Sequence, residues 1–268
     1  MRVGFKRKLR ETVERNNSLL CIGLDPDPEK LPAGITIAQF NRAIIDATSD
    51  LVCAYKPNLA FYESHGIEGM RALEETLACI PTSIPVIGDA KRGDIGNTAR
   101  HYARALYDVL GFDAATLSPY LGLDSIEPFI AYAEKCTFLL CRTSNPSAKD
   151  FQDLFIQGQP LYEVVACKAR EWNVRGNIGL VVGATYPKEL ARIRQLCPAM
   201  CLLIPGVGTQ GGDVAAVVRQ GTDSSGMNAI INTSRAVLYA SSGTDFAEAA
   251  RLSAMRLRDE INANRCPN

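Results

Sequence analysis

The chain has 268 residues, of which 47% are hydrophobic and 22% are charged, and its 29 basic residues balance its 29 acidic ones. This is the composition of a globular protein with a sizeable core, and the balanced charge argues against a nucleic acid as its partner. No apolar run is long enough to cross a membrane, and the first residues are too charged for a signal peptide. We therefore expect a cytoplasmic protein with no membrane partner.

Predicted strands and helices alternate along the chain. A helix is expected over residues 6–15, ahead of the first strand. Eight short apolar runs bounded by turn residues then predict strands at 19–24, 51–55, 85–88, 114–117, 137–141, 178–182, 201–204 and 229–231. Helical composition or periodicity marks residues 71–79, 98–110, 162–172, 187–196, 214–220 and 244–262.

This alternation favours parallel β/α units, and eight units in about 250 residues match a (β/α)8 TIM barrel of the α/β class. No change in composition marks a domain boundary, so residues 1–268 are expected to form a single catalytic domain. The first helix would cover the barrel floor. The longer stretch 144–175 is interpreted as an active-site loop followed by a helix.

Charged and polar residues follow most of the predicted strands, at the ends that meet at the mouth of such a barrel. Taken singly, each is more often a turn former, a helix cap or a charge on the rim. Five charged strand ends that converge on one mouth instead indicate a catalytic site. The candidates are Asp25 after the first strand, Lys56 after the second, Asp89, Lys91 and Asp94 after the third, Ser144 after the fifth and Arg235 after the eighth.

The third strand carries the densest cluster. Asp89 and Lys91 are two residues apart, so in an extended strand both side chains leave by the same face, and Asp94 follows Gly93, where the chain can turn. Such charges at the end of a buried strand are costly unless they are paired or functional. A lysine flanked by carboxylates keeps its proton. Lys91 is therefore suited to protonate a carbon on which negative charge develops, and not to form a Schiff base.

A phosphate site is predicted beside this cluster. A glycine-rich segment, 205–212, follows the seventh strand, and Arg235 follows the eighth. Loops seven and eight of such barrels often bind phosphate through backbone N–H groups, and an arginine adds a forked cationic donor. A plain turn beside a structural arginine is the alternative. Together with the Lys91 cluster, this segment predicts an enzyme that acts on a phosphorylated metabolite.

Metal and thiol chemistry are not expected. The nine cysteines include no C-x-x-C pair, and several lie within apolar runs, where a reduced thiol packs as a small hydrophobe. The two histidines, His65 and His101, do not stand at a metal-ligand spacing.

The pattern Asp89-x-Lys91-x-x-Asp94-Ile95-x-x-Thr98 after an apolar strand resembles the orotidine 5'-phosphate decarboxylase family, in particular its longer bacterial branch. The resemblance covers nearly the whole chain. The other features that fall in the family's order and spacing are Asp25, Lys56, Ser144-Asn145-Pro146, the segment 205–212 and Arg235.

The resemblance implies a lyase of de novo pyrimidine biosynthesis that converts orotidine 5'-monophosphate to UMP and carbon dioxide without cofactor or metal. Lys91 would protonate C6 of the pyrimidine, within a charged array completed by Asp89, Asp94 and Lys56. It also implies a homodimer in which Asp94 and Thr98 serve the partner's site. The implied substrate contacts are Asp25 and Thr98 to ribose, Ser144 to the pyrimidine edge, and Gln210, Ser234 and Arg235 to the phosphate.

Two alternatives stay open at this point. A Mg²⁺-dependent sugar-phosphate decarboxylase or synthase of the same suprafamily shares Asp-x-Lys-x-x-Asp, but would need a further acidic ligand for the metal. A non-catalytic phosphate- or nucleotide-binding barrel is the second alternative, although a mere binder has little use for so crowded a set of charges.

Overall fold

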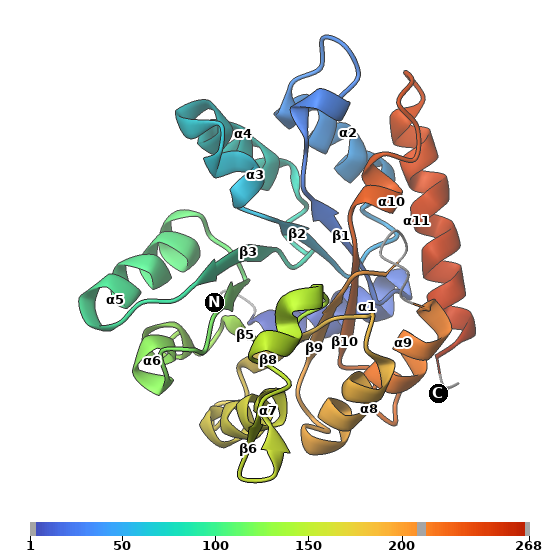
Figure 1. Cartoon of the computed structure of the whole chain (residues 1–268). Helices are drawn as coiled ribbons and strands as arrows, with labels where there is room; N and C mark the ends of the chain where they lie inside the picture. Colours follow the sequence, from blue (N-terminus) through green and yellow to red (C-terminus); the bar gives the residue numbers. More distant parts are fainter. Residues whose placement is uncertain (1–3, 208–212, 266–268) are drawn as a thin grey trace.

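The computed structural model describes residues 4–207 and 213–265 and shows the (β/α)8 TIM barrel that the sequence predicts (Figure 1). Within these residues, eight parallel strands form one sheet in the order β2-β1-β10-β9-β8-β5-β4-β3. Isolated parallel bridges, Tyr55 to Val86 and Asn58 to Asp89, join its two edges and close the barrel. The strands are β1 (Leu20–Leu24), β2 (Ala54–Pro57), β3 (Ile87–Arg92), β4 (Ala114–Leu117), β5 (Cys136–Arg142), β8 (Ile178–Val182), β9 (Leu202–Pro205) and β10 (Ala229–Thr233).

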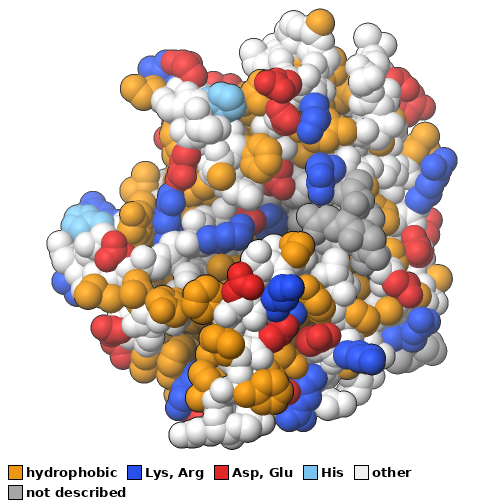
Figure 2. Space-filling view, viewed as in Figure 1, with side chains coloured by type: hydrophobic (Ala, Val, Ile, Leu, Met, Phe, Trp, Pro, Cys, Tyr) orange, Lys and Arg blue, Asp and Glu red, His pale blue; other side chains and the backbone are white. Residues whose placement is uncertain are grey.

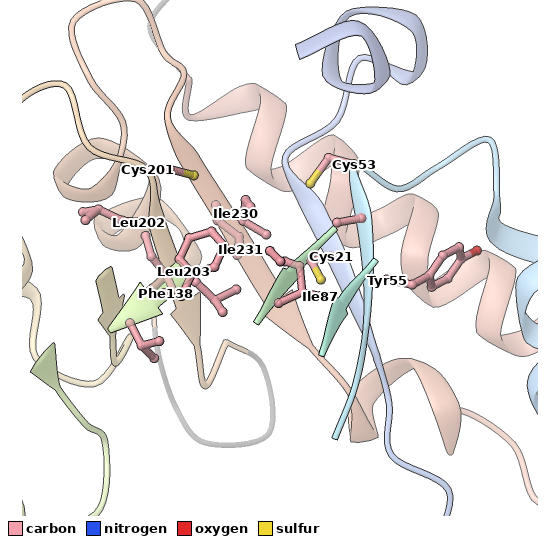
Figure 3. Packing of buried hydrophobic residues seen from close by; sticks show 14 of the residues in the cluster. Cys21, Cys53, Tyr55, Ile87, Phe138, Cys201, Leu202, Leu203, Ile230 and Ile231 are labelled. Atoms are coloured by element: carbon pink, nitrogen blue, oxygen red, sulfur yellow. The ribbon is translucent and has the colours of Figure 1, made fainter. Parts of the chain in front are cut away.

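The strands are almost continuously apolar because the barrel buries both of their faces. Every residue of β1, β4, β8 and β10 is buried. Inside the barrel the side chains pack as a solid core, part of which is shown with Ile87, Phe138 and Leu203 from three different strands (Figure 3). The opposite faces of the strands pack on the helices; Tyr55, for example, donates its hydroxyl to the backbone carbonyl of Ile45.

The helices form the outer layer around the strands (Figure 1). Across the described residues, none of them combines the length and the apolar character that a membrane span requires. The longer helices are α1 (Phe5–Asn16), α2 (Ile37–Thr48), α4 (Gly66–Cys79), α5 (Gly96–Arg104), α6 (Leu123–Ile130), α7 (Leu161–Trp172), α8 (Pro187–Leu196), α9 (Val214–Gly221) and α11 (Phe246–Ala263). Short helical turns are 3-10 segments at Pro28–Lys30 and Pro146–Asp150, α3 (Ala60–Glu63), a π-helical turn at Ala105–Val109 and α10 (Arg235–Leu238).

Helix α1 lies against the starts of the strands. The Phe5 ring packs edge-on against Phe138 of β5, with ring centroids 5.9 Å apart. Lys8 forms a 2.7 Å ion pair with Asp113, directly before β4. The helix is therefore at the end of the barrel opposite to the carboxyl ends of the strands.

The stretch after β5 contains a loop and then a helix, as the sequence predicts. The loop holds the Pro146–Asp150 turn and a short hairpin of β6 (Phe155–Ile156) and β7 (Gln159–Pro160), and it leads into α7. Buried Arg142 anchors it. The guanidinium stacks over Tyr186 at 3.9 Å, pairs with Asp153 at 3.2 Å and donates to Gln152.

Candidate active site

A pocket of about 420 Å³ opens at the carboxyl ends of β1, β2, β3, β9 and β10. Figure 2 views this face of the molecule, where Lys and Arg side chains, with acidic ones among them, gather around the centre. The lining residues form two sides. One carries acidic and lysine side chains from the ends of β1, β2 and β3, and the other includes a glycine and an arginine from the ends of β9 and β10. They include Asp25, Lys56, Asn58 and Asp89 on the first, and Gly206, Val207, Ser234 and Arg235 on the second.

The first side holds a chain of alternating charges. Lys56 of β2 places its Nζ 2.7 Å from Asp89 Oδ2, and Lys91 places its Nζ 2.6 Å from Asp89 Oδ1. Lys56 and Asp89 are buried, whereas the Lys91 side chain is 48% exposed. One carboxylate is thus held between two ammonium groups, one on a buried lysine and one on a half-exposed lysine.

Opposite charges keep this array ionised despite its burial. Burial by itself would raise the pKa of the Asp89 carboxyl, but Lys56 and Lys91 outweigh this effect and hold the pKa well below its usual value. Burial would likewise lower the pKa of the Lys56 ammonium, yet the charges of Asp89 and Asp25 raise it above its usual value. The pocket therefore presents fixed charges at neutral pH.

The backbone conformation that brings Asp89 and Lys91 together differs from the one that the sequence predicts. Lys91 is not extended: its φ is +47°, in the left-handed region that a lysine rarely adopts. The pairing of β3 with β4 also shifts register between Gly88 and Arg92. A bulge, and not the simple alternation of an extended strand, turns the Lys91 side chain back to Asp89.

Asp25 is fixed at the end of β1 beside the same array. Its Oδ2 accepts a 2.6 Å hydrogen bond from the Ser234 hydroxyl, and its Oδ1 accepts the Asn58 backbone N–H at 3.2 Å. Gly23 makes this approach possible, because a Cβ at that position would collide with the Ser234 hydroxyl. The Tyr239 hydroxyl donates to the Asp25 carbonyl and closes the corner of the pocket.

Arg235 lines the opposite side of the pocket, where it begins α10 directly after Ser234. Gly206 lines the same side of the pocket with a φ of +100°, which a side chain would disfavour. Gln210, predicted to contact the phosphate, lies outside the described residues, as does the rest of segment 208–212.

Lys91, Asp94, Thr98 and Ser144 are not among the described residues that line this pocket, although Lys91 pairs with the lining residue Asp89. Asp94 Oδ1 accepts the Ile95 backbone N–H at 2.8 Å, and within residues 4–207 and 213–265 the carboxylate forms no ion pair. Thr98 is exposed on α5. Ser144 lies in the loop after β5, where its backbone approaches Gly183 so closely that a Cβ there would lie 2.9 Å from the Ser144 nitrogen.

The structure adds residues to which the sequence patterns assign no role, and four of them are polar neighbours of the charged array or of the pocket. Asn58, Asn232 and Tyr239 line the pocket, and Thr116 donates to Asp89 Oδ1 at 2.9 Å. Asn58 and Asn232 stand at strand ends, so the rule that found Asp25 and Lys56 could have found them too. Tyr239 and Thr116 carry no such signal, because tertiary packing alone brings Tyr239 to Asp25 and Thr116 to Asp89.

In the part of the chain that the structure describes, no group of three or more His, Cys, Asp and Glu side chains is arranged to hold a metal ion.

Comparison with known proteins gives a consistent result. Residues 18–251 match the model of the orotidine 5'-phosphate decarboxylase / HUMPS family. An orotidine 5'-phosphate decarboxylase of Dehalococcoides mccartyi is 54% identical, over 96% of this chain and 97% of its own length. One from Herpetosiphon aurantiacus is 56% identical over 92% of this chain and 94% of its own.

Solved structures agree in fold as well as in sequence. The OMP decarboxylase of Leishmania donovani superimposes with a TM-score of 0.87 at 41% identity, over 98% of this chain and 99% of that one. The UMP synthase of the same organism gives a TM-score of 0.90, and this chain spans 57% of its length. On the strength of the family model and of relatives more than half identical over nearly their full length, the chain belongs to the orotidine 5'-phosphate decarboxylase family.

Proposed function

We propose that Lys91 is the proton donor when this pocket converts orotidine 5'-monophosphate to UMP and carbon dioxide. Decarboxylation of this nucleotide, a carboxy-lyase step of UMP biosynthesis, is the activity of the family to which the chain belongs. The observation that carries the assignment is the buried Asp89 carboxylate held between the Lys56 and Lys91 ammonium groups.

The reaction breaks one carbon–carbon bond. The electron pair of that bond stays on C6 of the pyrimidine when carbon dioxide leaves, and a proton must then be added to C6. A positioned ammonium group stabilises the developing charge and afterwards supplies the proton. Lys91 fits this role, because it is the exposed member of the array and Asp89 fixes its Nζ at 2.6 Å. Lys56 balances the Asp89 charge from the buried side.

The sugar and the base would occupy the space beside this array. Asp25 lines the pocket, and its carboxylate oxygens can accept hydrogen bonds from the ribose hydroxyls. Ser144 is proposed to bind the pyrimidine edge from the loop after β5. This loop is anchored by the buried Arg142.

The phosphate would occupy the opposite side, against Arg235 and the backbone N–H groups near Ser234, with Gln210 proposed as a further contact. Arg235 and Gly206 line the pocket together and leave the backbone open to an anion. The phosphate is remote from the reacting carbon, but its binding energy can be used to fix the substrate for reaction.

Arg235→Ala is expected to lower kcat/KM for orotidine 5'-monophosphate by roughly 100-fold, because a charge-assisted contact of about 3 kcal/mol is lost. Steady-state kinetics on orotidine, which lacks the phosphate, supplies the internal control: there the variant should match the wild type. Arg258→Ala, on the surface of α11, is the matched arginine control. An Arg235→Ala enzyme with unchanged kcat/KM for the phosphorylated substrate would refute the phosphate contact.

A homodimer is also proposed, in which Asp94 and Thr98 complete the partner's site. Three observations support it. Asp94 lies two residues after the end of β3 yet forms no ion pair within the described residues. Ile95 beside it is 53% exposed, and the apolar side chains of Tyr120 and Leu121 are exposed on the loop after neighbouring β4. The loops after β3 and β4 lie close together: a Cβ added at Gly93 would be 3.3 Å from the Cβ of Ser118.

We further propose that residues 1–268 act as one catalytic domain in the cytoplasm. The contacts of α1 with β5 and with the segment before β4 tie the first helix to the barrel. Eight free cysteines among the described residues fit a reducing compartment.

The proposed function is tested by following the ultraviolet absorbance of orotidine 5'-monophosphate with the purified protein in EDTA. Loss of the orotate absorbance and formation of UMP are expected. Activity that disappears with EDTA and returns with Mg²⁺ would support a metal-dependent sugar-phosphate enzyme. Binding of the nucleotide without any turnover would support a non-catalytic barrel and overturn the proposed function.

A further inference from the structure

We infer that Thr116 is a positioning residue for the proton donor: its hydroxyl holds the Asp89 carboxylate and the Lys91 backbone in the geometry that aims the Lys91 ammonium. This inference rests on the role proposed for Lys91. Thr116 lies on β4, next to β3 in the sheet, and is 1% exposed. Because its side chain is buried and its hydroxyl contacts Asp89 and Lys91, it acts through these two residues and not on substrate.

The hydroxyl of Thr116 forms two hydrogen bonds whose directions are fixed. The Lys91 backbone N–H lies 3.0 Å from Oγ1, and because an N–H can only donate, Oγ1 accepts there. The single hydroxyl proton is then left for Asp89 Oδ1, at 2.9 Å. This is the same carboxylate oxygen that contacts Lys91 Nζ at 2.6 Å.

This arrangement closes a small ring through both ends of Lys91. Its backbone N–H is held by Thr116, its ammonium by Asp89, and Thr116 and Asp89 are held to each other. No other hydrogen-bonded group in the described part of the chain links the lysine's backbone and its side chain in this way.

The ring explains how a lysine stays in an unfavourable backbone conformation. The ladder between β3 and β4 is interrupted between Gly88 and Arg92, so the Lys91 N–H takes its acceptor from the Thr116 side chain. A left-handed φ in a non-glycine residue persists only where the surroundings fix it, and such positions cluster at active sites. Thr116 supplies one of the contacts that fix it.

Removing the hydroxyl should therefore act on the chemical step more than on binding. Valine has nearly the shape of threonine, but it leaves the Lys91 N–H without an acceptor and Asp89 without a neutral donor. The Lys56–Asp89 and Lys91–Asp89 ion pairs remain available. What is lost is the fixed orientation of the Lys91 ammonium. Small displacements of a catalytic group lower the rate steeply.

The test compares Thr116→Val, Thr116→Ala and Thr116→Ser with the wild type. Both hydroxyl-free variants are expected to lose about 10- to 100-fold in kcat for orotidine 5'-monophosphate, the usual cost of removing an orienting group behind a catalytic one. KM for the substrate and Kd for UMP should stay close to the wild-type values. Thr116→Ser keeps the hydroxyl and should recover most of kcat.

Thr137→Val is the matched control. Thr137 is also a fully buried barrel threonine, on β5, and its hydroxyl contacts Tyr107 at 3.2 Å, away from the charged array. This variant is expected to lower Tm without lowering kcat. If the Thr116 variants instead lose kcat only as far as they lose folded protein, as Thr137→Val would, the role of Thr116 is structural and the inference is wrong.

Two further results would overturn the inference. Wild-type kcat in Thr116→Val and Thr116→Ala would refute the positioning role alone and leave the proposed function standing. A wild-type protein that does not decarboxylate orotidine 5'-monophosphate would refute the proposed function, and the positioning role with it.

Discussion

Replacing Lys91 by alanine is expected to lower kcat for orotidine 5'-monophosphate by about 10³-fold or more, while UMP still binds. The variant loses both the cation that stabilises the charge on C6 and the proton that neutralises it. The phosphate and ribose contacts proposed for Arg235 and Asp25 are untouched. Single-turnover absorbance measures the chemical step, and calorimetry with UMP measures the binding.

The loss should come from the missing ammonium and not from a change in Asp89. In Lys91→Ala, Asp89 keeps its 2.7 Å pair with Lys56 and the hydrogen bond from Thr116, so it stays ionised. Lys168→Ala, on the surface of α7 and paired with Glu171, is the matched lysine control and should be fully active. Near-wild-type turnover in Lys91→Ala would rule out Lys91 as the proton donor.

The barrel itself could be predicted because its strands are buried on both faces. A parallel strand of this kind appears in the sequence as a short apolar run, and all eight runs correspond to strands of the sheet. The helix pattern is a weaker signal. It does not include α2, although Thr36 and Gln39 form a capping box at its start, a signal that is present in the sequence. Nor does it include α6, in which Pro128 interrupts the helical composition.

The helix predicted over 98–110 illustrates a second limit. The structure begins α5 at Gly96 and changes to a π-helical turn at Ala105–Val109. The composition of this stretch is helical throughout, so it carries no sign of the change in hydrogen-bond pattern.

The site could be predicted as a set of strand ends, because in a parallel barrel the carboxyl ends of the strands must meet at one mouth. That rule found Asp25, Lys56, Asp89, Lys91 and Arg235, which the structure brings to one face. It could not find Thr116, whose contact with Asp89 depends on how β3 and β4 pair across the bulge. A period of two residues along a strand contains no information about such a bulge.

At Asp94 the structure of the single chain differs most from the cluster that the sequence motif predicts. The motif Asp89-x-Lys91-x-x-Asp94 suggests one cluster, yet the structure brings together only the first two residues. The exposed apolar side chain of Ile95 adjoins the carboxylate that is left out, and Tyr120 and Leu121 add exposed apolar surface on the loop after β4. A second copy of the chain that covers this surface would bring its own Asp94 toward the charged array. Each copy of the motif would then contribute Asp89 and Lys91 to one site and Asp94 to the other.

Asp94→Ala is accordingly expected to lower kcat by about 100-fold or more, and mixing it with Lys91→Ala is expected to restore activity. In a mixed dimer, one site combines the intact Lys91 of one subunit with the intact Asp94 of the other, and the second site lacks both. Random exchange makes half of the dimers mixed, so roughly a quarter of all sites should be native. Turnover is measured after subunit exchange and compared with the sum of the unmixed variants.

Asp89→Ala mixed with Lys91→Ala is the matched control, because these two residues contact each other within one chain. Every mixed dimer then carries one defect in each site, and activity should not return. If the Asp94→Ala mixture also stays inactive although exchange is complete, Asp94 serves the site of its own chain. Recovery in that mixture alone means that each catalytic site is assembled from two subunits, so activity must fall when dilution separates the dimer.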